Sequence, residues 1–287
     1  MDINFLPKKF LGCESSFEDA NIVIFGAPFD GTTTFRPGTR FAPQTMRVES
    51  IGLETYSPYF DLDIEDYKIN DNGDLDLPFG STIGALNMIQ EQAKKIFDTN
   101  KKPLMIGGEH LVSLPVIKEA FNKYPDLHII HFDAHTDLRE EYLGEKLSHS
   151  SVFKRVWDFI GDGKICQFGI RSGTKDEFYW AKEGHIYINK FNFDTLDEVV
   201  KSLNGKPVYF SIDLDVLDPS IMSGTGTTEA GGVNFNELIN AIKEVSKLNI
   251  IGADIVELSP HYDHSGVSTA VACKILREML CAILANY

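Results

Sequence analysis

The chain has 287 residues, with 27 Lys and Arg against 42 Asp and Glu, so its formal net charge at pH 7 is −15. A negative surface repels phosphate, which argues against nucleic acid as a partner and favours a small cationic ligand. The content of 43% hydrophobic and 24% charged residues is typical of a folded globular protein and excludes a disordered chain. Residues 1–20 contain no apolar core of signal-peptide length, and no stretch approaches ~18 apolar residues, so we expect a cytoplasmic protein without membrane contact.

Short apolar runs alternate with longer amphipathic segments, and no repeat or linker divides the chain. The apolar runs, rich in Ile, Val and Phe, predict strands buried on both faces at 21–25, 103–106, 127–132, 165–169, 185–188, 208–212 and 250–255. Apolar residues at helical spacing predict helices at 81–100, 111–122, 150–160, 196–203, 234–248 and 268–285. This alternation predicts a single α/β domain over 1–287, with three α/β/α layers around a mostly parallel central sheet.

The four cysteines of the chain form no C-x-x-C pair. This spacing excludes zinc-finger and thioredoxin-type redox sites, which need paired thiols. Cys166 lies in an apolar run, and Cys273 and Cys281 lie in a helical segment, so we expect buried free thiols.

Residues that commonly bind metal ions directly follow three of the predicted strands. In a parallel sheet, ligands bind outside the carboxyl ends of the strands, so side chains at these positions can meet. Alternate residues of an extended chain point to the same side, so Asp133, His135 and Asp137 can act together. The candidate ligands are His110, Asp133, His135, Asp137, Asp213 and Asp215.

The charges of these candidates predict a site for two metal ions. Four carboxylates in one place raise each other's pKa and cannot all stay ionised without cations. Two divalent ions would balance the four negative charges, and six ligands serve two ions only if some carboxylates are shared. A ligand set that is rich in oxygen and lacks thiolates favours Mn²⁺, so we expect two Mn²⁺ ions per chain.

The segments that carry these residues resemble the ureohydrolases, the family of arginase, agmatinase and their relatives. They are GGEH at 107–110, DAHTD at 133–137 and SIDLDVLDP at 211–219. The similarity also includes GAPFDGTTTFRPGTRFAPQTMR at 26–47, GTGTTEAGG at 224–232 and ADIVELSP at 253–260, so it covers nearly the whole chain. It is strongest to the bacterial agmatinases, and it implies the arginase-like ureohydrolase fold with a binuclear manganese centre.

The resemblance also implies how the candidate ligands are shared. One ion takes His110, Asp133, Asp137 and Asp213. The other takes Asp133, His135, Asp213 and Asp215. Asp133 and Asp213 therefore bridge the two ions.

Three catalytic roles follow from the same motif positions. Glu257 corresponds to the acid that binds the guanidinium group, since a carboxylate can hold a planar guanidinium through two parallel hydrogen bonds. Asp137 corresponds to the acid that moves a proton to the leaving nitrogen. His149, in LSHSSVF, corresponds to the histidine that relays protons close to the substrate.

The preferred substrate on this basis is agmatine, cleaved to putrescine and urea. After the DAHTD block, the chain carries Arg139 with Glu140, Glu141 and Glu145, and this acidic stretch suits a cationic tail better than a carboxylate. Thr228 stands where the family usually has proline, in a loop close to the metal ligands, and this departure bears on side-chain specificity.

Several alternatives remain open from the sequence. Guanidinobutyrase, arginase and formimidoylglutamase share the metal blocks, and a family member could also serve as a regulatory subunit without turnover. The family resemblance implies a homo-oligomer, either a trimer or a hexamer. Outside the ligand set, His131 is expected to be a buried, hydrogen-bonded histidine, and Arg36 and Arg40 are expected to be structural.

Overall fold

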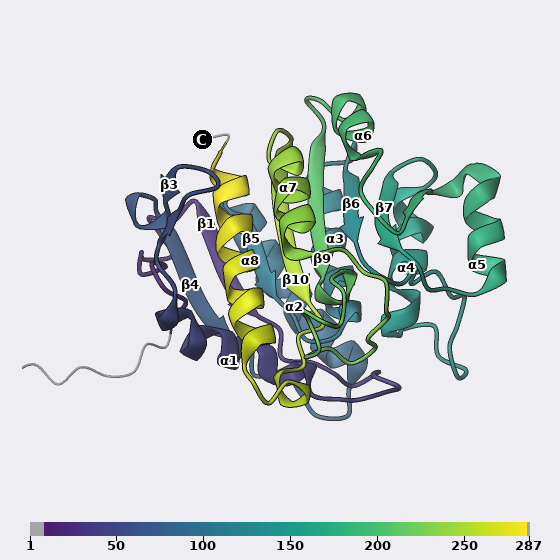
Figure 1. The fold of residues 1–287 in the computed structure, drawn as a ribbon, viewed down its shortest axis with the longest axis horizontal. Coiled ribbons are helices and arrows are strands. Elements are labelled where there is room, and N and C mark those ends of the chain that lie inside the picture. The colour runs from purple at the N-terminus through teal and green to yellow at the C-terminus, as the bar shows by residue number, and fades with distance from the viewer. Residues whose placement is uncertain (1–8, 286–287) are drawn as a thin grey trace, which may run out of the picture.

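The computed structural model describes residues 9–285, which form one eight-stranded sheet between two layers of helices (Figure 1). The sheet has the strand order β4-β1-β5-β10-β9-β6-β7-β8, and every neighbouring pair is parallel. Its strands are β1 (Ile22–Gly26), β4 (Ile69–Asp74), β5 (Lys102–Ile106), β6 (His128–Phe132), β7 (Ile165–Ile170), β8 (Tyr187–Lys190), β9 (Pro207–Asp213) and β10 (Asn249–Val256). A small antiparallel pair, β2 (Tyr56–Ser57) and β3 (Leu62–Asp63), lies outside this sheet.

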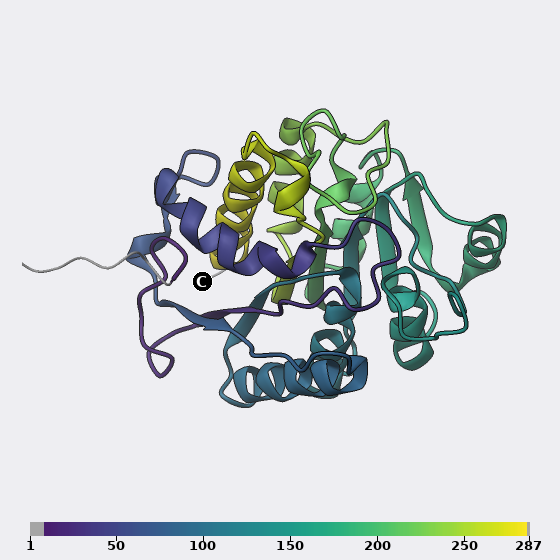
Figure 2. The ribbon, with the colours of Figure 1, turned by 90° about the horizontal axis from the view of Figure 1, so that it is seen from below.

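The helices cover both faces of the sheet, which confirms the predicted α/β/α fold (Figure 2). One face carries α1 (Ala42–Glu49), α6 (Leu196–Ser202), α7 (Phe235–Val245) and α8 (Val267–Leu284). The other face carries α2 (Thr82–Asp98), α3 (Ser113–Lys123) and α4 (Val152–Ile160). The short helix α5 (Lys175–Trp180) lies beyond β7, towards the β8 edge of the sheet (Figure 1).

Each face of the sheet contributes to its own hydrophobic core. Ile130 and Phe210 pack into the core below α7 and α8, whereas Ile129 and Tyr209 pack into the core below α2 and α3. Consecutive strand residues thus point to opposite faces and are buried on both, which explains why the strands appear in the sequence as continuous apolar runs. The four cysteines are free and buried, as predicted.

All seven predicted strands are present, but the strand β4, the short pair of β2 and β3, and the helices α1 and α5 were not predicted. The edge strand β4 has the polar sequence INDNGD and pairs only with β1, so it carries no apolar run. The helices α1 and α5 are short, with 8 and 6 residues, and are too brief for a periodic pattern. The strand predicted at 185–188 begins later, at Tyr187, because a π-helical turn occupies Ala181–His185.

The strand order determines which side chains can meet. β5, β10, β9 and β6 are neighbours in the sheet, and their carboxyl ends lie along one edge. Among the described residues, no helix is long and apolar enough to cross a membrane. The expectation that the chain begins without a secretion signal falls partly on residues 1–8, which lie outside the described residues.

Candidate metal and catalytic site

Four candidate ligands converge on one point at the carboxyl ends of β5, β6 and β9. Nδ1 of His110 lies 3.2 Å from Oδ2 of Asp133, 3.4 Å from Oδ2 of Asp137 and 3.2 Å from Oδ2 of Asp213. His110 and Asp133 are almost completely buried, at 1% and 0% exposure. The four atoms surround a position where a cation could bind several of them at once.

A second group of candidate ligands lies beside the first. Nδ1 of His135 is 3.0 Å from Oδ2 of Asp215 and 3.5 Å from Oδ1 of Asp133. Asp133 therefore turns one oxygen towards His110 and the other towards His135, which is the geometry that a carboxylate shared by two ions requires. Two sets of side chains are close enough together to hold a metal ion, namely His110, His131 and Asp133, and Asp133, His135 and Asp215, and Asp133 belongs to both.

The electrostatics of the two groups fit divalent cations. Burial and the charge of the neighbouring carboxylates raise the pKa of Asp137 and Asp213 well above the usual range. Burial opposes charge on the imidazoles, but the carboxylates beside His110 and His135 raise the pKa of both well above normal. Bound cations would relieve the repulsion among these buried carboxylates, and an oxygen-rich set with two imidazoles suits a hard divalent ion.

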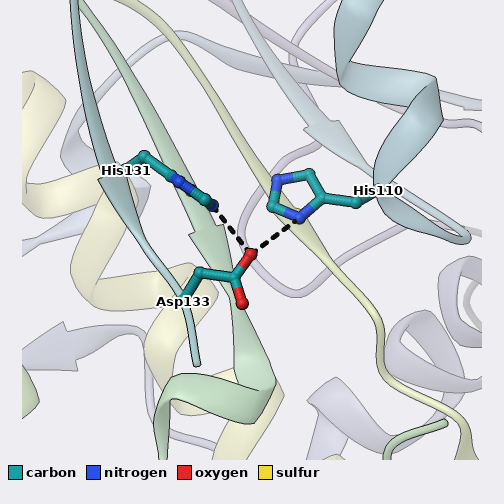
Figure 3. Close-up of side chains that lie close together, drawn as sticks. All are labelled: His110, His131 and Asp133. Carbon is teal, nitrogen blue, oxygen red and sulfur yellow. Dashed lines mark hydrogen bonds and ion pairs between the residues drawn. The ribbon is translucent and has the colours of Figure 1, made fainter. Parts of the chain in front are cut away.

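His131 supports Asp133 through a hydrogen bond (Figure 3). Its Nε2 lies 2.8 Å from Oδ2 of Asp133, and its Nδ1 lies 2.9 Å from Nε2 of Gln167, which also donates to the carbonyl of Thr136 over 2.7 Å. Since Gln167 donates to Nδ1, the proton of His131 is on Nε2 and points at Asp133. Burial lowers the pKa of His131 to about 4, so the ring is neutral, and the prediction of a buried, hydrogen-bonded histidine is confirmed.

His110 is held from its far side by buried hydroxyl and carboxyl groups. Its Nε2 lies 3.0 Å from Oγ of Ser211, and that hydroxyl donates to Oδ1 of Asp254 over 2.6 Å. The hydroxyl of Tyr209 donates to the other oxygen of Asp254 over 2.7 Å. Since the hydroxyl of Ser211 donates to Asp254, it accepts from Nε2 of His110, and Nδ1 is the ring nitrogen that would bind a cation.

Glu257 follows β10 and shares backbone contacts with the end of β5. Its Oε1 accepts a hydrogen bond from the N–H of His110 over 2.9 Å, and its own N–H donates to the carbonyl of Gly108 over 2.9 Å. Burial and the charge of Glu109 raise the pKa of Glu257 to about 8. A buried carboxylate with a raised pKa gains strongly from a cationic partner such as a guanidinium group.

Two residues of this site have a strained backbone. Asp137 and Glu257 both have left-handed backbone conformations, with φ of 54° and 67°. Such conformations cost a non-glycine residue on the order of 1 kcal/mol and persist where surrounding contacts enforce them. Gly108 is also required, because a Cβ there would lie 1.8 Å from the carbonyl oxygen of Phe29.

A cavity of about 250 Å³ opens onto both groups of candidate ligands. Its lining includes Asp137, Asp213 and Glu257 together with His149 and Arg139. Burial lowers the pKa of His149 to about 4, so its imidazole is neutral at neutral pH. The cavity therefore brings together the three residues that the sequence predicts to be catalytic, Asp137, His149 and Glu257.

The expectation that the acidic stretch contacts the substrate is not supported by the geometry. Arg139 lines the cavity, with its guanidinium 4.5 Å from the ring centre of Tyr142. Glu140, Glu141 and Glu145 are exposed and lie outside this lining, and Glu140 pairs with Lys154 at 3.3 Å and Arg155 at 3.1 Å. Arg139 is two residues after Asp137 and lines the cavity, whereas the three glutamates come later in the same loop and are exposed.

Several contributors were missed or only partly anticipated from the sequence. Arg171 donates to the carbonyls of Asp215 and Glu229 over 2.6 and 2.8 Å, so it ties the end of β9 to the 224–232 loop. Its position directly after β7 was the available signal. Arg40, which was expected to be structural, forms an ion pair with Asp30 at 2.7 Å, while Arg36 lies over the rings of Phe35 and Tyr262.

Comparisons with known proteins agree with this geometry. The profile of the Arginase family matches residues 20–282. An agmatinase of Bacillus anthracis is 51% identical over 284 residues, covering 97% of each chain, and a guanidinobutyrase of Pseudomonas aeruginosa is 31% identical, covering 90% of this chain and 85% of the relative. The crystal structure of an agmatine ureohydrolase of Thermoplasma volcanium superposes with a TM-score of 0.89 at 29% identity, covering 99% of this chain and 96% of that one. The chain therefore belongs to the Arginase family.

Proposed function

We propose that this protein is a binuclear manganese hydrolase that cleaves agmatine to putrescine and urea. The observation that carries the proposal is the cluster of six metal-type ligands beside one cavity, which His135, Asp137 and Asp213 line together with Glu257. The high identity to the Bacillus anthracis agmatinase over nearly the full length supports agmatine as the substrate.

The six ligands would hold the two ions as the family pattern implies, with Asp133 and Asp213 shared. His110 and Asp137 would serve one ion, and His135 and Asp215 the other. When bound, such a pair of ions supplies the Lewis acidity that makes a water molecule nucleophilic at neutral pH. The hard, oxygen-rich donor set favours Mn²⁺ over softer metals.

The residues of this chain would then orient the substrate and move protons. Glu257 holds the guanidinium group by charge-assisted hydrogen bonds, with its Oε1 already positioned by the N–H of His110. Asp137, in the cavity lining, carries a proton from the attacking water to the leaving nitrogen. His149, neutral at pH 7, exchanges protons between the cavity and solvent.

Urea release tests the proposal directly. Protein loaded with Mn²⁺ should release urea from agmatine faster than from arginine or 4-guanidinobutyrate. Asp133→Ala should abolish turnover, whereas Asp197→Asn, at an exposed ion pair with Lys201, should leave it unchanged. Absence of urea from all three substrates with both ions bound would favour a regulatory family member without turnover.

Guanidinobutyrase is the second candidate, and one observation favours it. Arg139 places a cation in the cavity lining, where it could pair with the carboxylate of a guanidino acid. The guanidinobutyrase of Pseudomonas aeruginosa is also a relative, although at lower identity. A preference for 4-guanidinobutyrate over agmatine would select this alternative and leave the binuclear hydrolase intact.

A further inference from the structure

The loop after β1 contacts His149 at three points, and two of these contacts involve Thr32. Nδ1 of His149 lies 2.9 Å from the carbonyl oxygen of Thr32, and the backbone N–H of His149 donates to Oγ1 of Thr32 over 3.1 Å. One residue, 117 positions away in sequence, therefore holds both the backbone and the ring of the histidine.

These contacts determine which ring nitrogen carries the proton. A carbonyl oxygen only accepts hydrogen bonds, so the contact with Thr32 requires a proton on Nδ1. Burial lowers the pKa of His149 to about 4, so at neutral pH the ring carries one proton and Nε2 keeps its lone pair. Nε2 lies 3.4 Å from Oγ1 of Thr34, another residue of the cavity lining.

Thr32 is itself held by a buried carboxylate. Its Oγ1 donates to Oε1 of Glu109 over 2.6 Å, and its N–H donates to the same oxygen over 3.1 Å. Glu109 is completely buried, and its Oε2 accepts from the N–H of Leu111 over 3.1 Å. The hydroxyl of Thr32 thus donates a hydrogen bond to Glu109 and accepts one from the N–H of His149. The donor and acceptor roles in this series of hydrogen bonds are therefore consistent.

The backbone connects this series of hydrogen bonds to the candidate metal ligands. Glu109 directly precedes His110, and its N–H donates to the carbonyl of Phe29 over 2.8 Å. The segment at the end of β5 therefore carries a candidate metal ligand and, one residue earlier, the anchor for the loop that holds His149. A shift of the loop would change the distance between the imidazole and the substrate position.

We propose that Thr32 is a positioning residue for the reaction, which holds His149 with its proton on Nδ1 and its Nε2 lone pair towards the cavity. The proposal rests on the proposed proton-transfer role of His149. Thr32 touches no reacting atom and acts only through the histidine and through Glu109.

A double-mutant cycle tests this role. Thr32→Val removes the hydroxyl with little change in volume and should lower kcat roughly 10-fold, less than the about 10²–10⁴-fold loss expected for removal of a general acid–base group. In a His149→Ala background, Thr32→Val should cost nothing further, because the residue through which it acts is gone. Thr32→Ser restores the hydroxyl and should recover most of the activity. KM and bound Mn²⁺ should stay near the wild-type values in all four variants.

A matched control and a spectroscopic measurement complete the test. Thr45→Val, in α1, removes a hydroxyl that donates to the carbonyl of Phe41 over 2.8 Å, and it should leave kcat unchanged. In protein loaded with a diamagnetic divalent ion, the ¹⁵N shifts of His149 should show a protonated Nδ1 in the wild type. Thr32→Val keeps the carbonyl but loses the hydroxyl bonds to Glu109 and to the N–H of His149, so the carbonyl is held less firmly against Nδ1 and a mixture of tautomers should appear.

The outcomes separate the two proposals. Normal kcat in His149→Ala would remove the proton-transfer role from the proposed function and, with it, the role of Thr32. Loss of activity in His149→Ala combined with a further loss in the double mutant would overturn only the inference about Thr32, since the loss would then act through something other than His149. A His149 protonated on Nε2 in the wild type would overturn it as well.

Discussion

The backbone N–H of His110 donates a hydrogen bond to Oε1 of Glu257 over 2.9 Å. A candidate metal ligand and the proposed guanidinium acceptor thus share a direct contact between the ends of β5 and β10. A second bond, from the N–H of Glu257 to the carbonyl of Gly108 over 2.9 Å, fixes the same two segments. One of these bonds joins two backbone groups and the other joins a backbone N–H to the carboxylate, so the end of β5 fixes the position of Glu257 relative to His110.

Glu257→Gln should impair both substrate binding and turnover. The amide oxygen can still accept from the N–H of His110, so the local fold is kept, but the charge-assisted pairing with a guanidinium is lost. Since that pairing also orients the reactive carbon, KM should rise and kcat should fall, each by about 10-fold or more. Steady-state kinetics with agmatine measure both. Bound metal should be unchanged, and a variant with wild-type kcat and KM would exclude Glu257 from guanidinium binding.

Removal of the metal ions should abolish activity and lower stability together. The buried carboxylates Asp137 and Asp213 have raised pKa values without cations, so they gain charge compensation when ions bind. Chelator-treated protein should lose urea release and unfold at a lower temperature, and Mn²⁺ should restore both.

Single-ligand variants refine the test of the metal site. Asp133→Ala should lower the bound metal by more than one ion per chain, because its two oxygens face His110 and His135. His110→Ala should spare the second ion. Metal content by elemental analysis checks this, and equal losses in both variants would argue against a shared Asp133.

The fold and most of the site were predictable because they depend on local patterns. The buried strands β6 and β9 are continuous apolar runs, and the ligands follow them directly in sequence. The contacts of Thr32 with Glu109 and His149 join residues 77 and 117 positions apart, and no local pattern encodes such pairings. The polar edge strand β4 was missed for a related reason, since its pairing with β1 comes from the tertiary structure and not from its composition.

Arg139 should influence substrate choice, and Glu141 should not. Arg139 lines the cavity, whereas Glu141 is exposed and lies outside the lining, contrary to the expectation from the acidic stretch. Arg139→Gln removes a positive charge near the cationic tail of agmatine, so kcat/KM for agmatine should rise relative to that for 4-guanidinobutyrate by about tenfold. Glu141→Lys should change this ratio less than about twofold, because solvent and salt screen a charge that lies outside the cavity. A larger change of this ratio in Glu141→Lys would show that the acidic stretch does influence substrate binding.

The stability of the protein should depend on pH through His149. Its pKa is lowered to about 4 in the folded state, chiefly by burial, whereas an unfolded histidine has a pKa of about 6.5. As the pH falls below about 6.5, the unfolded chain binds a proton that the folded protein does not, so the free energy of unfolding decreases until the pH approaches 4. His149→Asn removes this proton. Between about pH 7 and about pH 5.5, the wild type should therefore lose about 1 kcal/mol more stability than the variant.

Urea unfolding at the two pH values, with the same Mn²⁺ concentration for both proteins, measures this difference. Protonation of the metal ligands weakens both proteins alike and cancels in the comparison. Bound cations close to His149 would lower its pKa further and keep the sign of the effect. If the two proteins lost stability equally, the imidazole would have to be protonated in the folded state over this range. Its Nε2 would then lack the lone pair that the proposed proton transfer requires.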